Sequence, residues 1–141
     1  MSRIADLGPN YSKLPGLIAE YEDAFSNIEE HLKLTGKVLD TALKEQGAWI
    51  IYYAQRRAEL KTVLKYLDDR VSAVRGSLAK RYVENYPRTL GERVMNSYID
   101  SEPEYLNIRE LYLEVEDLYS RYDAAVDAFE KRGYALRGLR R

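Results

Sequence analysis

The sequence contains no cysteine, one histidine and no long run of apolar residues. The absence of cysteine excludes disulfides, thiolate nucleophiles and cysteine metal ligands. No apolar stretch approaches the roughly 18 residues that a membrane-spanning helix needs, and the N-terminus does not have the layout of a signal peptide. We therefore expect no membrane partner, and a location in the cytoplasm of the cell that makes the protein.

Recognisable catalytic motifs are also missing. His31 has no candidate nucleophile or metal ligand near it in the sequence. The segment RGSLAKRY, residues 75–82, lacks the second glycine and the Gly-Lys-Ser/Thr ending of a phosphate-binding loop. Glu110, Glu114 and Asp117 fit one helix face, which is typical of a solvated surface more than of a Mg²⁺ site. We predict that the protein is not an enzyme and holds no metal or cofactor.

Charge is segregated along the chain, although the net charge of the 141 residues is only −1. Residues 1–54 carry a net charge of −3 and residues 55–93 carry +5. Residues 94–130 carry −8, and the tail 131–141 carries +5. Such asymmetry indicates an anionic partner or head-to-tail self-association, whereas patchy solvated helix faces are the simpler interpretation.

The spacing of apolar residues predicts an all-α protein, an elongated helical hairpin or bundle of long amphipathic helices that oligomerises. Residues 1–14 form a flexible lead-in to a single domain spanning residues 1–141. Residues 15–86 form either a hairpin of two helices or one long bent helix. We favour the hairpin, broken at Gly36 or Gly47, because one helix of that length would extend about 100 Å.

A short helix is expected over 91–99 and a long amphipathic helix over 103–132. Pro103 suits the first turn of this helix, and Gly133 is a natural residue to end it. Lys131 and Arg132 would then complement the negative end of the helix dipole. Residues 133–141 would form a basic C-terminal turn that turns back and places its apolar side chains, which are Tyr134, Leu136 and Leu139, against apolar surface.

The apolar face of the 103–132 helix is wide enough to need two neighbours, and we expect another subunit to cover it. The residues predicted at this oligomer interface are Tyr112, Val115, Tyr119, Tyr122, Val126, Phe129, Tyr134 and Leu136. For the C-terminal turn, contact with a neighbouring subunit and contact with nucleic acid are equally consistent with the sequence.

Thirteen tyrosines accompany the basic residues, and most of them fall on the helix stripes as packing residues. A few lie among cations: near Arg56 and Arg57, around Lys80, Arg81 and Arg88, and before Arg137. Cations that neutralise phosphates and rings that stack on bases are what single-stranded nucleic acid requires.

Two ends of the chain resemble the UvsY family, the recombination mediators of tailed phages. The segment YIDSEPEYL (98–106), the long helix and AFEKRGYALRGL (128–139) are similar to the C-terminal half of that family. KLPGLIAEYEDAF (13–25) resembles the family's entry into its first helix. The family's basic, DNA-binding stretch corresponds to either WIIYYAQRR (49–57) or RGSLAKRYVENYP (75–87).

The resemblance implies a ring-like homo-oligomer in the host cytoplasm that takes part in DNA recombination and repair. It would bind single-stranded DNA, loosen the single-stranded-DNA-binding protein, and help load a RecA-like recombinase. We favour Arg75, Lys80 and Arg81 as the DNA contacts, with Arg56 and Arg57 in reserve. Arg88 and Arg137 are also predicted to contact DNA. The alternative is a helical scaffolding or assembly protein with no nucleic-acid role.

Overall fold

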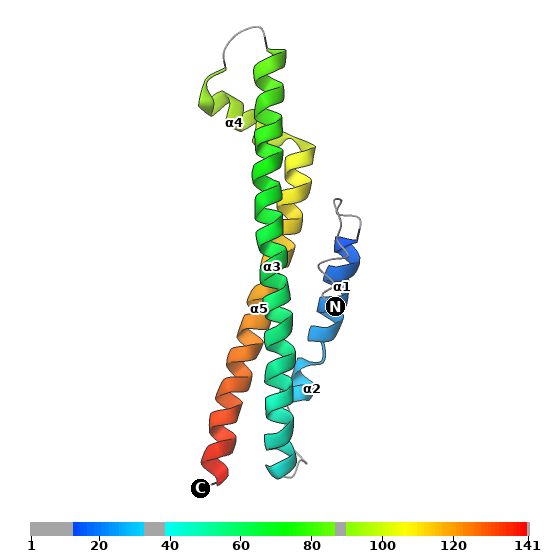
Figure 1. Cartoon of the computed structure of the whole chain (residues 1–141), viewed down its shortest axis with the longest axis vertical. Helices are drawn as coiled ribbons and strands as arrows, with labels where there is room; N and C mark the ends of the chain where they lie inside the picture. Colours follow the sequence, from blue (N-terminus) through cyan, green and yellow to red (C-terminus); the bar gives the residue numbers. More distant parts are fainter. Residues whose placement is uncertain (1–12, 33–38, 87–89, 141) are drawn as a thin grey trace. The chain divides into compact units, whose positions relative to one another are not determined.

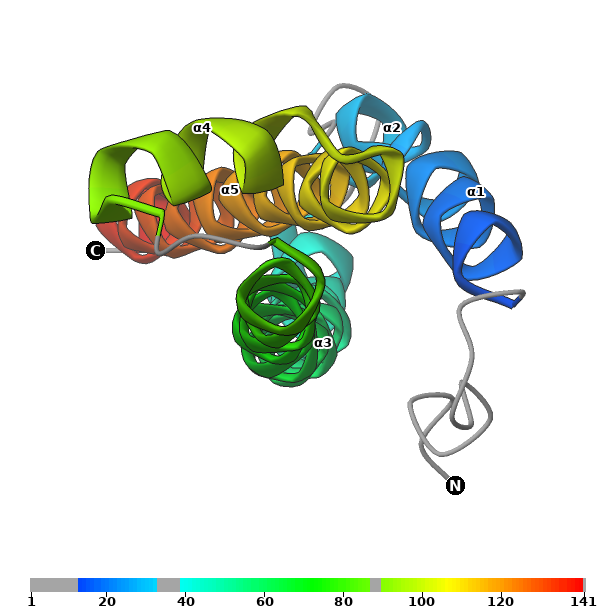
Figure 2. The same cartoon turned by 90° about the horizontal axis from the view of Figure 1, so that it is seen from above.

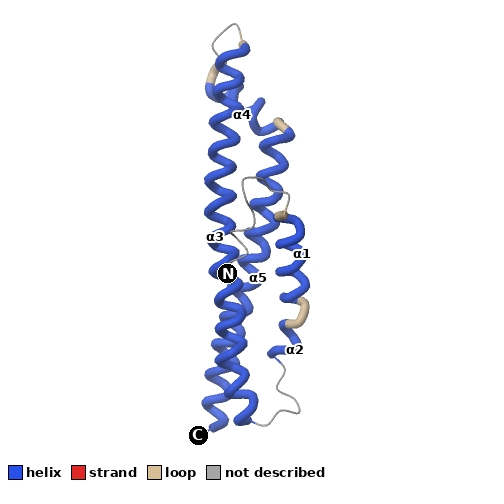
Figure 3. Tube along the Cα trace, turned by 45° about the vertical axis from the view of Figure 1, so that its right-hand side comes forward, coloured by secondary structure: helices blue, strands red, loops and turns tan. Residues whose placement is uncertain are grey.

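The computed structural model describes residues 13–32, 39–86 and 90–140, and within them all regular secondary structure is helical (Figure 1, Figure 3). The helices are α1 (Leu14–Phe25), α2 (Ile28–Leu32), α3 (Leu39–Asn85), α4 (Glu92–Ser101) and α5 (Pro103–Arg140). The all-α prediction is confirmed, with two long helices.

The helices form two compact units, to both of which α3 and α5 contribute. Unit 1 contains residues 1–62 and 116–141, and unit 2 contains residues 63–115. No helix in the described ranges is long and apolar enough to cross a membrane.

In the described part of the region 15–86 the chain forms three helices, of which α3 is the long one. α1 carries Pro15 in its first turn, where a missing backbone N–H costs nothing, and it ends at Phe25 before Ser26. The short α2 follows, and α3 begins at Leu39. The predicted break at Gly36 lies outside the described residues.

The alternative break at Gly47 is wrong, because α3 runs through that residue without interruption. Gly47 lies on the exposed side of the helix, while Ala42, Tyr53 and Leu60 are buried on the other side. A glycine inside a helix costs about 1 kcal/mol, and burying a single large apolar side chain contributes about 1.5–3 kcal/mol. Continuous packing therefore outweighs the local preference for a break.

Unit 1 is held together by aromatic side chains from three helices. Tyr21 of α1 contacts Tyr122 of α5 edge-on, with ring centroids 5.8 Å apart, and the Tyr122 hydroxyl donates to the Tyr21 carbonyl at 2.7 Å. Tyr53 of α3 stacks on Phe129 of α5 at 5.2 Å. α1 and α2 follow one another along one side of this unit (Figure 2). Tyr53, Tyr122 and Phe129 are fully buried and form its core.

Unit 2 has an aliphatic core, in contrast to unit 1. It packs the C-terminal part of α3, α4 and the start of α5 around buried residues, which recur at intervals of four and seven along α3 and of seven along α5. They are Val63, Leu67, Val74, Leu78, Ile99, Ile108 and Val115.

The predicted helix end at Gly133 is also wrong, since α5 continues to Arg140. Gly133 is buried against α3, and a Cβ atom there would lie 2.9 Å from Nε2 of Gln46. The glycine therefore permits the close approach of two helices and does not cap one. Leu136, one turn further, is 2% exposed, so packing extends the helix beyond the glycine.

Two expectations about the tail fail with that helix end. Arg132 does not complement a helix terminus, because it lies inside α5 and is only 7% exposed. Its Nη1 donates to Oε1 of Gln46 at 2.8 Å, and burial lowers the pKa of its guanidinium. Tyr134 does not pack against the chain, being 70% exposed. The side chain of Leu139 lies outside the described residues.

Candidate nucleic-acid interface

A cluster of three tyrosines lies in unit 2, where α3 ends and α4 passes. Tyr82 and Tyr86 are one turn apart at the end of α3, and Tyr98 comes from α4. The ring centroid of Tyr82 lies 5.6 Å from the ring centroid of Tyr86 and also 5.6 Å from that of Tyr98. Tyr86 and Tyr98 stack at 6.0 Å with an interplanar angle of 18°. We call these three residues the tyrosine cluster.

A hydrogen bond holds one member of the tyrosine cluster in place. The Tyr82 hydroxyl donates to the carboxylate of Glu102, which follows α4. Because the carboxylate disfavours a neighbouring phenolate, this bond raises the pKa of Tyr82 to about 12. Tyr86 and Tyr98 remain 41% and 42% exposed. The cluster thus has a fixed base and two accessible rings.

The cations favoured as DNA contacts lie in the same unit, and each has an acidic partner. Arg75 donates to Asp100 at 2.7 Å and to Asn96 at 3.1 Å. Arg81 is 3.7 Å from Glu104. Lys80, with a 78% exposed side chain, is 3.9 Å from Glu84. Exposed ion pairs of this kind contribute about 0–1 kcal/mol, so a phosphate can replace the carboxylate at little cost.

The reserve cations Arg56 and Arg57 lie in unit 1, and they too have partners within the chain. Arg56 covers the ring of Tyr52 at 4.4 Å and lies 3.5 Å from Glu59. Arg57 donates to Asp123 at 2.9 Å. Arg137 stands over the exposed ring of Tyr134 at 4.8 Å. Arg88 lies outside the described residues.

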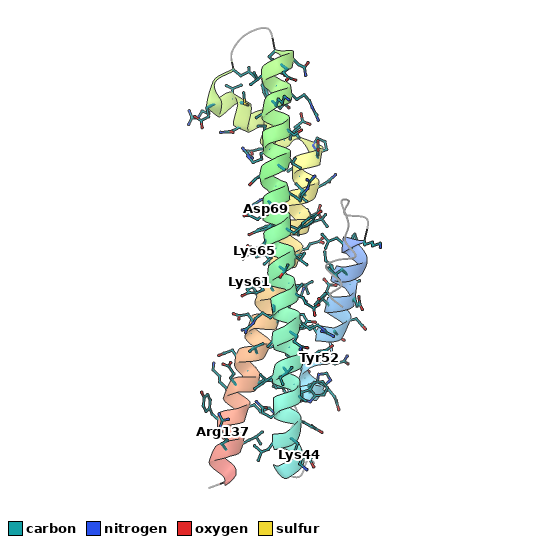
Figure 4. The ribbon with its side chains drawn as sticks, in the orientation of Figure 1. Lys44, Tyr52, Lys61, Lys65, Asp69 and Arg137 are labelled. Carbon is teal, nitrogen blue, oxygen red and sulfur yellow. The ribbon has the colours of Figure 1, made fainter. Side chains whose placement is uncertain are left out.

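Sequence reasoning missed a set of lysines on α3. Lys44, Lys61 and Lys65 are exposed and make no ion pair with any described residue (Figure 4). No acidic residue occurs among the exposed positions of α3 from Thr41 to Lys65. Arg93 of α4 is likewise exposed and unpaired within the described chain. Placing residues 41–65 on a helix, with the exposed positions known, would have shown that no acidic residue is exposed there. The sequence alone did not indicate which positions are exposed.

The predicted oligomer interface is largely core, which corrects its assignment. Five of its eight residues are at most 2% exposed within the single chain: Val115, Tyr122, Val126, Phe129 and Leu136. Tyr112 and Tyr119 are half-buried, and Tyr134 alone is well exposed. The chain's own helices cover this face, so its width does not require another subunit.

His31, the one histidine of the sequence, lies between aromatic side chains of α3. His31 stacks on Trp49 with centroids 3.6 Å apart, and its Nδ1 lies 2.9 Å from the Tyr53 hydroxyl, which docks α2 onto α3. The described side chains contain no group of three or more His, Asp or Glu residues that could hold a metal ion.

No family model, curated protein or solved structure matches this chain.

Proposed function

We propose that this chain binds single-stranded DNA as a homo-oligomer and acts as a recombination mediator of the UvsY type. In this role it helps load a RecA-like recombinase onto DNA coated with single-stranded-DNA-binding protein. The resemblance at the two ends of the chain supports the mediator role. The tyrosine cluster of unit 2 supports binding to single strands.

The exposed ring pair of Tyr86 and Tyr98 carries the proposal. Tyrosine rings suit a binding surface because each has an apolar face and a polar hydroxyl, and Tyr86 and Tyr98 are 41% and 42% exposed. Unpaired bases stack on such rings with little sequence preference, at about 1–3 kcal/mol per base. Lys80 and Arg81 stand beside Tyr82 in the sequence, and their exposed carboxylate partners are easily exchanged for phosphates.

The test is binding to a fluorescent oligo-dT across a salt series, measured by anisotropy. Replacing Tyr86 with alanine should weaken binding by about fivefold to 150-fold, whereas Tyr86→Phe should retain most of the affinity because the ring remains. An equal loss in both variants would contradict stacking.

Two substitutions that remove positive charge test the phosphate contacts in the same assay. Lys80→Ala with Arg81→Ala should reduce the steepness of the log–log salt dependence by about 1.4, since each contacted phosphate contributes about 0.7. Lys80→Ala alone should reduce it by about 0.7, and Lys131→Ala is the control for this single change. Its side chain is 76% exposed and forms an i,i+4 pair with Asp127 at 3.0 Å, much as Lys80 pairs with Glu84. An equal effect of the control would mean that only net charge matters.

The mediator role has its own test. The protein should shorten the lag before a RecA-like recombinase displaces single-stranded-DNA-binding protein from oligo-dT. Tyr86→Ala should lose most of that effect, and an unchanged effect would separate mediator action from the tyrosine cluster.

A helical assembly protein is the second candidate, favoured by a different observation. Six of the eight exposed large apolar side chains found in the described residues lie in unit 2, among them Val83, Val94 and Leu106. A scaffold would use these side chains for protein contacts. Absence of oligo-dT binding even at low salt would select this candidate.

A further inference from the structure

Two leucines of α5 in unit 2 point into solvent at helical spacing. Leu106 is 50% exposed and Leu113 is 47% exposed. Residues seven apart lie on the same line of an α-helix, about 10.5 Å from each other. They form a short apolar ridge that the chain's own helices leave half uncovered.

Two opposite charges lie on the same face, between the leucines. Arg109 and Glu110 are both exposed, and neither forms an ion pair with another described residue. Positions i, i+3, i+4 and i+7 share one helix face, so the four side chains form one surface. We call Leu106, Arg109, Glu110 and Leu113 the α5 ridge.

The α5 ridge is complementary to itself. A two-fold axis between positions 109 and 110 brings Leu106 of one copy opposite Leu113 of the other. The same axis brings Arg109 opposite Glu110, twice. In a two-fold contact, if residue i of one copy contacts residue j of the other, then residue j of the first copy also contacts residue i of the second. Both kinds of contact within the ridge, leucine with leucine and arginine with glutamate, are favourable.

We propose that two copies of this chain pair through the α5 ridge with their α5 helices antiparallel. This inference rests on the self-association in the proposed function and adds where two copies meet. It moves the self-contact away from the interface between Tyr112 and Leu136 that was expected from the sequence, because five of the eight residues predicted there are buried within the chain.

The residues one turn beyond the ridge at either end limit the length of the contact. The same axis would bring Glu102, which directly precedes α5, toward Asp117, and two carboxylates repel. Both carboxylates are already engaged within the chain, Glu102 by the Tyr82 hydroxyl and Asp117 by Arg121 at 2.8 Å. The ridge is therefore a two-turn contact of modest affinity, below the usual size of a permanent interface.

Cysteine cross-linking tests the antiparallel register, because the natural chain has no cysteine. Full-length Leu106→Cys and Leu113→Cys, carrying tags of different size, are mixed and oxidised without DNA. The expected product joins a Leu106→Cys chain to a Leu113→Cys chain in excess over either self-pair. Gln55→Cys, exposed on α3, gives the background from random collision. Self-pairs as abundant as the mixed product, or cross-linking no greater than that background, overturn the proposal.

Charge reversal tests the same register without a covalent bond. Arg109→Glu alone and Glu110→Arg alone each create two like-charge meetings, and each should weaken self-association by about tenfold in sedimentation analysis. The double variant restores both attractions. An equal mixture of the two single variants also restores them, but only between unlike chains. A mixture that associates no better than its components overturns the proposal.

The outcome is separable from that of the proposed function. These measurements contain no DNA, and oligo-dT binding is measured on the same variants. If the ridge variants show no pairing in the predicted register but the protein binds oligo-dT, only this inference is refuted. If the copies pair in that register but do not bind oligo-dT, only the nucleic-acid proposal is refuted.

Discussion

Replacing Gly133 with alanine should destabilise the protein, although the same change usually stabilises a helix. Alanine is favoured over glycine inside a helix by about 1 kcal/mol. At Gly133, however, the added Cβ would lie 2.9 Å from Nε2 of Gln46, and one of the two must move.

Gln46 cannot move freely, because its amide makes two hydrogen bonds in a buried position. Its Nε2 donates to the Phe129 carbonyl, and its Oε1 accepts from Arg132 at 2.8 Å. Each buried group left without its partner costs about 1–3 kcal/mol. The free-energy cost of displacing Gln46 therefore exceeds the gain in helix propensity. Gly133→Ala should lower the free energy of unfolding by at least about 1 kcal/mol.

Urea unfolding followed by circular dichroism, at one fixed protein concentration, measures this change. Gly47→Ala is the matched control, since it lies mid-helix in the same unit with no atom within 4 Å of its Cβ position. It should stabilise by about 0.5–1 kcal/mol. In a Gln46→Ala background, Gly133→Ala should become stabilising, because the obstructing side chain is gone. Equal stabilisation by Gly133→Ala and Gly47→Ala in the natural chain would refute the reasoning.

Two further predictions concern the aromatic core and its titration. Phe129→Ala should cost about 3–5 kcal/mol of unfolding free energy, whereas Tyr134→Ala, on the exposed side of the same helix, should stay within about 0.5 kcal/mol in urea unfolding. Comparable losses in both would contradict the burial pattern of α5. Burial raises the pKa of Tyr53 to about 12, above the value near 10 of an unfolded chain. As the pH rises, the unfolded state therefore loses this proton at a lower pH than the folded state does. The contribution of Tyr53 to the free energy of unfolding is complete below pH 10 and decreases as the pH rises toward 12. Tyr53→Phe should flatten the fall in urea midpoints measured from pH 8 to 11, and an unchanged slope would exclude Tyr53 as a cause.

The helical character and the two longest amphipathic segments were readable from apolar spacing. The pattern around Tyr122, Val126 and Phe129 correctly indicated a buried face. It did not indicate what buries that face, because a stripe of apolar residues is the same whether its cover is another helix of the chain or another subunit. The structure supplies Tyr21 and Tyr53 as the cover.

The candidate site was only partly predictable for a similar reason. Lys80, Arg81, Tyr82 and Tyr86 are close in the sequence, so the sequence suggested them together. Tyr98 was not included, since it comes from α4 and reaches the other rings only through the packing of unit 2. The acidic partners of the cations are likewise contributed by the tertiary structure.

By itself, the sequence determined the helical character, the absence of thiol chemistry and the segregation of charge, because these depend on residue type and local spacing. Only the tertiary structure decided the roles of the glycines. Gly47 and Gly133 both suggested helix ends, yet both lie within continuous helices. Local conformational preference at one residue amounts to about 1 kcal/mol, and the burial of neighbouring side chains from distant parts of the chain exceeds it.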